Sequence, residues 1–253
     1  MTDDILWVIQ TDLFQNNDRD RILDTLDKFD VSYQEISLSS DRILSPEINH
    51  TGKIITNGSV MLSSIAKERG WKPGAFFNDN FSYDIWYPHF KNYLLNKNAV
   101  FTTIREANPT INEFFLRPLK DDKSFNGRIT SLSDFKEWKK NIVDNDLKPD
   151  TKILYSPLKI IGQEYRHFII DKKVISSSRY KLGDKASTSN QVDNSIIEFA
   201  EKMAKIWQPA EAFVLDTYVS GDEMGIVEIG CICNAGFYEA DVQKIIMTLN
   251  NFS

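Results

Sequence analysis

The chain has 253 residues, of which 42% are hydrophobic and 26% charged, and its formal net charge at pH 7 is −6. This composition is typical of a soluble globular protein, and the length suffices for one large or two small hydrophobic cores. The negative charge argues against broad binding to nucleic acid or to an anionic membrane surface, and no apolar stretch is long enough to span a bilayer. The two cysteines, Cys231 and Cys233, are too close in one predicted strand to cross-link readily. This spacing fits a reducing compartment, so we expect a cytoplasmic protein.

The first part of the chain alternates between strand and helix patterns. Short apolar runs predict strands at 5–9, 31–38 and 53–56, and helical spacing of apolar residues follows the first and third of them. This alternation predicts a small α/β domain over residues 1–95. The aromatic residues of 71–93 favour a core cluster under a loop over a platform for base stacking.

The part from residue 96 to 253 is richer in strand patterns, with predicted strands at 99–103, 113–117 and 151–155. A basic loop follows the second of these strands. It is either a flap over phosphates, with Lys120 and Lys123 as point charges and Arg117 at the strand end, or a solvated turn, which the residues slightly favour. Pro157 interrupts strand pairing and predicts a hinge from Ser156 to Leu158.

Residues 163–181 predict a hairpin that turns at 171–173. By strand alternation, Glu164 and Arg166 share one face, and Arg179 and Lys181 share a face of the partner strand. Several cations on one face need an anion, and phosphate or carboxylates such as Glu164 satisfy that need equally well. An amphipathic helix is predicted next, at about 192–207.

The segment AFVLDTYVSGDEMGIVEIGCICNAGFYEAD predicts a final hairpin, and each of its strands carries one acid, Asp216 and Glu228. Counting back from the turn, the two carboxylates lie near each other on one face, where they repel unless a cation sits between them. Mg²⁺ is the best candidate because it prefers hard oxygen ligands and is commonly shared with phosphates. The alternative is that one acid is a strand-edge charge facing water, and the residues alone leave the two readings even.

Several segments, taken in order, resemble the ATP-grasp superfamily. The similar segments are FFLRPLKDDKSFNGR, EYRHFIIDKKVISSSRYK, FVLDTYV and VEIGCICNAGFY, together with GSVMLSSIAKERGWKPGAFFNDNF and YLLN nearer the N-terminus. The resemblance is to a divergent clade of phage and bacterial proteins related to the eukaryotic cell-division-cycle assembly factor for a translation initiation factor. It implies an α/β (α+β) protein, in which a small α/β leading domain, 1–95, precedes an ATP-grasp domain, 96–253, whose two α+β subdomains grip ATP.

The resemblance also implies a role for each site residue. For ATP binding these are a phosphate contact, a closing loop, an adenine-reading hinge and an acid near the nucleotide: Arg117; Lys120 and Lys123; Tyr155, Ser156 and Leu158; Glu164. Three further cations, Arg166, Arg179 and Lys181, would act in catalysis by facing phosphate or the acceptor. Asp216 and Glu228 would hold Mg²⁺. The family commonly has an asparagine two residues after the last acid, but Gly230 stands there, so Asn234 or a water would supply the third ligand.

The implied activity is an ATP- and Mg²⁺-dependent ligase that joins a carboxylate-bearing acceptor, such as a peptide or protein, to an amine donor through an acyl phosphate. The protein's share in such chemistry is charge stabilisation and alignment. The alternative is an ATP-binding assembly or regulatory factor that forms no bond, which the eukaryotic relative and Gly230 both support. A metal nuclease using Asp216 and Glu228 is a weaker reading because of the acidic composition.

Overall fold

The computed structural model describes residues 5–13, 17–119, 124–142 and 147–252. By their internal contacts these residues form two compact units, one made of Met1–Asn78 and Gly162–Ser253 and the other of Asp79–Ile161. This grouping is different from the predicted division between residues 95 and 96, which stays a prediction about the order of domains along the chain. In the described part of the chain no helix combines the length and apolarity needed to cross a bilayer.

The first unit begins with a mixed sheet of strand order β3-β2-β1-β4-β5, in which β1 lies between two parallel partners. Its strands are β1 (Ile5–Gln10), β2 (Tyr33–Leu38), β3 (Leu44–Ser45), β4 (Lys53–Asn57) and β5 (Pro73–Gly74), and its helices are α1 (Asp18–Lys28) and α2 (Val60–Glu68). Val8, Ile54 and Leu62 belong to the core between sheet and helix. Ser59 begins α2, because its hydroxyl accepts a bond from the Leu62 amide. The predicted α/β character of this region is confirmed.

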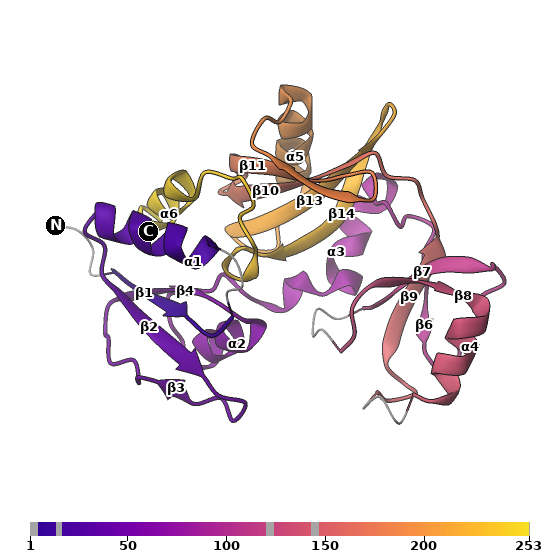
Figure 1. Cartoon of the computed structure of the whole chain (residues 1–253), viewed down its shortest axis with the longest axis horizontal. Coiled ribbons are helices and arrows are strands. Elements are labelled where there is room, and N and C mark those ends of the chain that lie inside the picture. The colour runs from indigo at the N-terminus through magenta and orange to yellow at the C-terminus, as the bar shows by residue number, and fades with distance from the viewer. Residues whose placement is uncertain (1–4, 14–16, 120–123, 143–146, 253) are drawn as a thin grey trace. The chain divides into compact units, whose positions relative to one another are not determined.

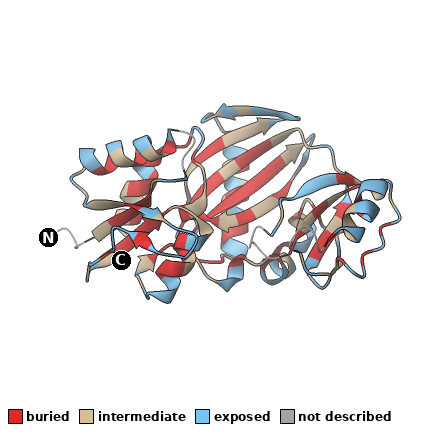
Figure 2. Cartoon of the chain, turned by 60° about the horizontal axis from the view of Figure 1, so that its bottom comes forward, coloured by how far each residue is buried: buried red, intermediate tan, exposed pale blue. Residues whose placement is uncertain are grey.

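The second sheet of the same unit is antiparallel throughout, with strand order β12-β11-β10-β13-β14 (Figure 1). Its strands are β10 (Gln163–Ile170), β11 (Lys173–Leu182), β12 (Lys185–Ser189), β13 (Ala212–Ser220) and β14 (Glu223–Cys231). The turn between β10 and β11 places both Asp171 and Lys172 at positive φ, 47° and 64°, as in tight two-residue hairpins. Buried residues run along the strands of this sheet (Figure 2).

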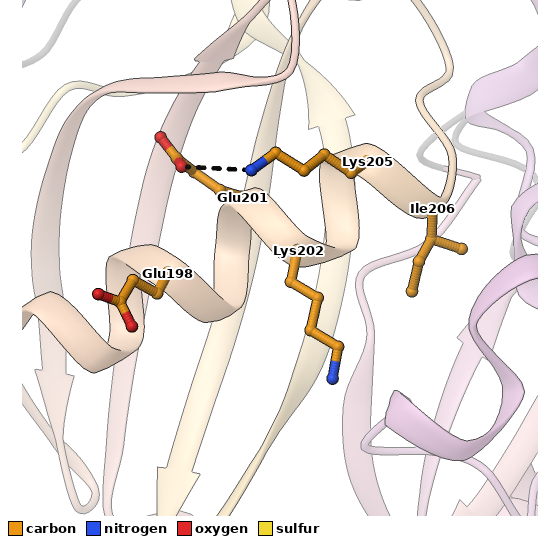
Figure 3. Close-up of a pocket in the computed structure, with 5 residues that line it drawn as sticks. All are labelled: Glu198, Glu201, Lys202, Lys205 and Ile206. Atoms are coloured by element: carbon orange, nitrogen blue, oxygen red, sulfur yellow. Dashed lines mark ion pairs between the residues drawn. The ribbon is translucent and has the colours of Figure 1, made fainter.

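Helix α5 (Asn194–Ile206) packs on one face of this sheet, against β10 and β11. The short helix η4 (Ile232–Asn234), a loop over residues 235–241 and α6 (Val242–Asn250) follow β14, and this loop and α6 contact the opposite face. The outward side of α5 is charged: Glu198, Glu201, Lys202, Lys205 and Ile206 line a shallow pocket, and Lys205 lies 3.9 Å from Glu201 (Figure 3). This outward side is what an amphipathic helix exposes to water.

The second unit contains a four-stranded antiparallel sheet of order β6-β9-β7-β8. Its strands are β6 (Val100–Thr103), β7 (Glu113–Pro118), β8 (Arg128–Ser131) and β9 (Lys152–Pro157), and its helices are η1 (Asp79–Phe81), α3 (Tyr83–Phe90), η2 (Lys91–Tyr93) and α4 (Leu132–Lys140). Phe114 and Phe135 pack edge to face, with ring centroids 5.5 Å apart, in the core between sheet and α4. Tyr83 and Trp86 are buried, which confirms that the aromatic stretch serves as core.

Candidate active site

Four predicted site residues lie on one face of the antiparallel sheet of β10 to β14. Residues directly opposite each other in antiparallel strands point to the same side, and here Arg166 on β10 pairs with Asp216 on β13, which pairs with Glu228 on β14. Glu164 is two residues before Arg166 on β10 and therefore shares that face. This acidic and basic cluster comes from three adjacent strands of one sheet, so its geometry does not depend on a flexible loop.

The centre of the cluster is a bidentate ion pair between Arg166 and Asp216. Arg166 Nε donates to Asp216 Oδ1 at 2.9 Å and Nη2 donates to Oδ2 at 2.8 Å. The side chains are only 17% and 7% exposed, so the pair is largely removed from water. Burial raises the pKa of the Asp216 carboxyl, Arg166 opposes that rise, and the nearby Glu228 and Glu164 add to it. Burial also acts to lower the pKa of Arg166, but the Asp216 charge outweighs it and raises that pKa. Parallel fork-to-fork bonds are the geometry of two ionised groups.

Two tyrosines that the sequence analysis did not select lie beside the Arg166 guanidinium. Its central carbon is 5.2 Å from the ring centre of Tyr238 and 5.8 Å from that of Tyr180. The two rings stack on each other with centroids 5.2 Å apart and planes 15° apart. These contacts are cation–π interactions, which strengthen when the cation is desolvated. Tyr238 holds a backbone φ of 50°, an uncommon conformation for a bulky residue and one frequent at functional sites.

Glu164 has its own partners on β11. Lys181 Nζ lies 2.9 Å from Glu164 Oε1, and the Tyr180 hydroxyl donates to Oε2 at 2.7 Å. Burial raises the pKa of Tyr180, and the carboxylates of Asp216 and Glu164 raise it further, so Tyr180 stays a hydrogen-bond donor. The predicted pairing of Glu164 with cations of this hairpin is therefore met by Lys181.

Arg179 lies on the other face of the sheet, so the prediction that it shares a face with Lys181 is wrong. The pairing steps from Glu164 with Lys181 to Tyr165 with Arg179, which makes Tyr180 an extra, bulged residue. Arg179 consequently shares the face of Tyr165, opposite to that of Glu164. Its guanidinium donates to the carbonyl oxygen and the hydroxyl of Ser187 on β12, at 3.3 and 3.2 Å. The alternation rule failed because a β-bulge breaks the two-residue period.

Helix α1 and the sheet both hold the loop over residues 235–241 that carries Tyr238. Asp18 is buried, and its carboxylate accepts the Phe237 amide at 3.1 Å. Arg21 donates to the carbonyl oxygens of Tyr238 and Ala240 at 2.6 and 2.5 Å, and Arg166 Nη1 donates to that of Gly236 at 3.2 Å. Asp18 and Arg21 precede Tyr238 by more than 200 residues, so no local sequence signal indicated this contact.

Asn234 was predicted as a metal ligand in place of the family's asparagine. Its side-chain oxygen accepts a bond from the Ser63 hydroxyl at 2.7 Å, so α2 engages the oxygen that a metal would need. Among the described residues no group of three or more histidine, cysteine, aspartate or glutamate side chains is arranged to hold a metal. Asp216 and Glu228 nevertheless offer hard carboxylate oxygens on neighbouring strands. Mg²⁺ commonly uses one or two carboxylates and completes its shell with water and phosphate, so this pair fits the ion.

The remaining predicted residues belong to the second unit. Arg117 is on β7, with its guanidinium carbon 5.5 Å from the Tyr83 ring centre. Tyr155 and Ser156 lie within β9, which extends to Pro157 and pairs it with Phe114, so the predicted hinge begins inside a strand. The Ser156 hydroxyl is buried and donates to Asn96 at 2.8 Å. Leu158 follows the strand and is 40% exposed. Lys120 and Lys123 lie outside the described residues.

Comparison with known protein families gives a match over most of the chain. Residues 48–249 match a family model described as an ATP-grasp domain, the third family of its clade. No curated protein matches the chain.

Solved structures with a similar fold cover nearly the whole chain. The ATP-grasp ligase PsnB complexed with its minimal precursor is 11% identical, with a TM-score of 0.61 over 99% of both chains. A structure of PsnB with minimal precursor, Mg and ADP is 11% identical, with a TM-score of 0.60 over 98% of this chain and 97% of that one. The D-alanine–D-alanine ligase from Bacillus anthracis complexed with ATP is 11% identical, with a TM-score of 0.60 over 97% of this chain and 91% of that one. At these identities the likeness shows the fold.

Proposed function

The chain belongs to the ATP-grasp domain family that its residues 48–249 match, and from this membership we propose that it is an ATP- and Mg²⁺-dependent ligase that joins a carboxylate to an amine. The observation that carries the proposal is the cluster of Asp216, Glu228 and Arg166 on one sheet face, where acids for a metal and a base for phosphate come together. Similar folds occur in PsnB, solved with a precursor, and in a D-alanine–D-alanine ligase solved with ATP. A peptide or protein is accordingly the acceptor class to test first.

The proposed reaction has two steps. An acceptor carboxylate oxygen attacks the γ-phosphorus of ATP, the bond to the β-phosphate oxygen breaks, and ADP leaves. The amine nitrogen then attacks the carbonyl carbon of the acyl phosphate, phosphate leaves with the bonding electrons, and the nitrogen loses a proton to give the amide. Neither step requires a covalent enzyme intermediate, so the protein's contribution is alignment and charge stabilisation.

The residues have distinct tasks in this proposal. Asp216 and Glu228 hold the metal, which when bound neutralises phosphate charge. Arg166, restrained by Tyr180 and Tyr238, stabilises negative charge on the transferred group. Lys181 holds Glu164 in place and lies at the rim of the cluster, 38% exposed, where it can reach an acceptor carboxylate. Arg179, on the opposite face, has no task in this mechanism.

In the second unit, Arg117 and the basic loop after it contact phosphate, and Tyr155 to Leu158 contact adenine. These assignments rest on the family membership. We also propose a cytoplasmic location, on the grounds of two cysteines that are free and buried.

A second candidate function is a nucleotide-dependent assembly factor that forms no bond. Two observations favour it: Gly230 occupies the position of the family's asparagine, and the Asn234 side-chain oxygen is bonded to Ser63. A metal shell with fewer protein ligands holds nucleotide with less control over the transferred phosphoryl group.

Release of ADP and phosphate separates the two functions. Purified protein is incubated with Mg-ATP and pools of carboxylates and amines, including peptides, and ADP is quantified. A ligase releases ADP only when both acceptor and amine are present, whereas a factor retains ATP and captures a protein partner without turnover. Asp216→Asn should abolish ADP release. Asp222→Asn, in the exposed β13–β14 turn, is the matched control and should leave release unchanged. Absence of any thermal stabilisation by millimolar Mg-ATP would exclude both functions, because a bound ligand must stabilise the folded state.

A further inference from the structure

The acids proposed to hold the metal already have a cation in contact with them. Arg166 bonds to both oxygens of Asp216, and both side chains are largely buried. A buried carboxylate beside a second one needs a positive charge nearby, and the guanidinium supplies it in the absence of any ligand.

The position of Arg166 does not depend on Asp216 alone. Arg166 also donates to the Gly236 carbonyl and lies against the rings of Tyr180 and Tyr238. The neighbouring acid Glu164 is matched separately by Lys181 and the Tyr180 hydroxyl. The local charges are thus arranged so that Arg166 serves the Asp216–Glu228 pair and Lys181 serves Glu164.

A divalent ion that approaches Asp216 has to overcome this arrangement. The fixed guanidinium repels it at close range, in surroundings of low dielectric where that repulsion is weakly screened. Nucleotide phosphates change the balance, because they attract the guanidinium through charge-assisted hydrogen bonds and bring the negative charge that a metal needs.

From this geometry we propose that Arg166 is the resident cation of the Asp216–Glu228 pair, which keeps divalent metal out until nucleotide phosphates draw the guanidinium away. Metal and nucleotide then bind together, and metal does not bind first. The inference rests on the proposed function in one respect, namely that Asp216 and Glu228 are the metal ligands.

The test uses nucleotide-free full-length protein and Mn²⁺, whose binding is followed by electron paramagnetic resonance. Arg166→Met removes the charge but keeps an unbranched apolar stem, and it should raise Mn²⁺ affinity at least tenfold over wild type. The gain should disappear in Arg166→Met combined with Asp216→Asn. The matched control is Arg179→Met, which removes an arginine from the opposite face of the same sheet and should give no gain. A folded Arg166→Met protein without increased Mn²⁺ affinity overturns the inference.

A second measurement on wild-type protein covers the case in which Arg166→Met does not fold. The side-chain Nε–H signal of Arg166 in an NMR spectrum reports its bond to Asp216. Mg²⁺ alone should leave this signal unshifted, and Mg²⁺ with a non-hydrolysable ATP analogue should shift it. A signal that moves with Mg²⁺ alone, or that stays in place with both, contradicts the inference. Neither measurement needs turnover, so failure of the ligase assay leaves this result interpretable, and failure here leaves the ligase assay so.

Discussion

His167, on β10, makes the stability of the first unit depend on pH. Its side chain is fully buried, Nδ1 lies 2.8 Å from the Ser177 hydroxyl and Nε2 lies 2.9 Å from the Thr217 hydroxyl. One hydroxyl can donate to the bare ring nitrogen while the other accepts the ring N–H, so neutral imidazole is fully bonded. Burial lowers the pKa of His167 to about 3 because the charged form loses its hydration.

The sign and size of the effect follow from proton linkage. An unfolded histidine has a pKa of about 6.5, so below that pH the unfolded state binds a proton that the folded state excludes. The free energy of unfolding therefore falls as the pH decreases from 6.5 towards 3, by about 1.4 kcal/mol per pH unit. Between pH 7 and pH 5 this single residue should cost roughly 2 kcal/mol.

Urea unfolding at several pH values between 5 and 8 measures this cost. Other groups also titrate in the range, so the comparison is between wild type and His167→Gln. Whatever its overall stability, the variant should lose about 2 kcal/mol less than wild type between pH 7 and pH 5. His89→Gln removes an exposed histidine from the second unit and controls for the loss of an imidazole as such. Equal pH slopes for wild type and His167→Gln would show that folded His167 accepts a proton, and the burial argument would be refuted.

Three further predictions concern backbone and loop geometry. Gly58→Ala should lower the free energy of unfolding by about 1–3 kcal/mol, because its new Cβ would lie 2.7 Å from a neighbouring side-chain carbon, whereas Gly230→Ala, with a 3.2 Å contact, should cost less in the same thermal denaturation assay. Replacing Asp171 and Lys172 by Asn-Gly should raise the melting temperature, with a gain of about 1 kcal/mol, since both residues have positive φ; an unchanged or lower melting temperature would contradict this. Arg21→Ala should speed hydrogen exchange in the loop over residues 235–241, because two hydrogen bonds to loop carbonyls are lost; exchange as slow as in wild type would show that other contacts hold the loop.

The amino-acid sequence by itself determined the character of each region and the main site strands. Alternating apolar runs indicated the α/β region at the N-terminus, and the polar turns indicated the hairpins of β10–β11 and β13–β14. Counting from the turn placed Asp216 beside Glu228, because cross-strand register depends only on the turn and the two-residue period. The order of short motifs indicated the family to which the chain belongs.

Only the tertiary structure decided which side chains meet around these acids. The bulge at Tyr180 moved Arg179 to the opposite face, and such a bulge is not visible in the alternation of residue types. The contacts of Asp18 and Arg21 with the Tyr238 loop join positions more than 200 residues apart, where no local pattern connects them. The ion pair of Arg166 with Asp216 likewise depends on β10 lying beside β13, a pairing of strands distant in the chain. Local periodicity encodes the faces of single elements, whereas packing between distant elements decides which of those faces form a site.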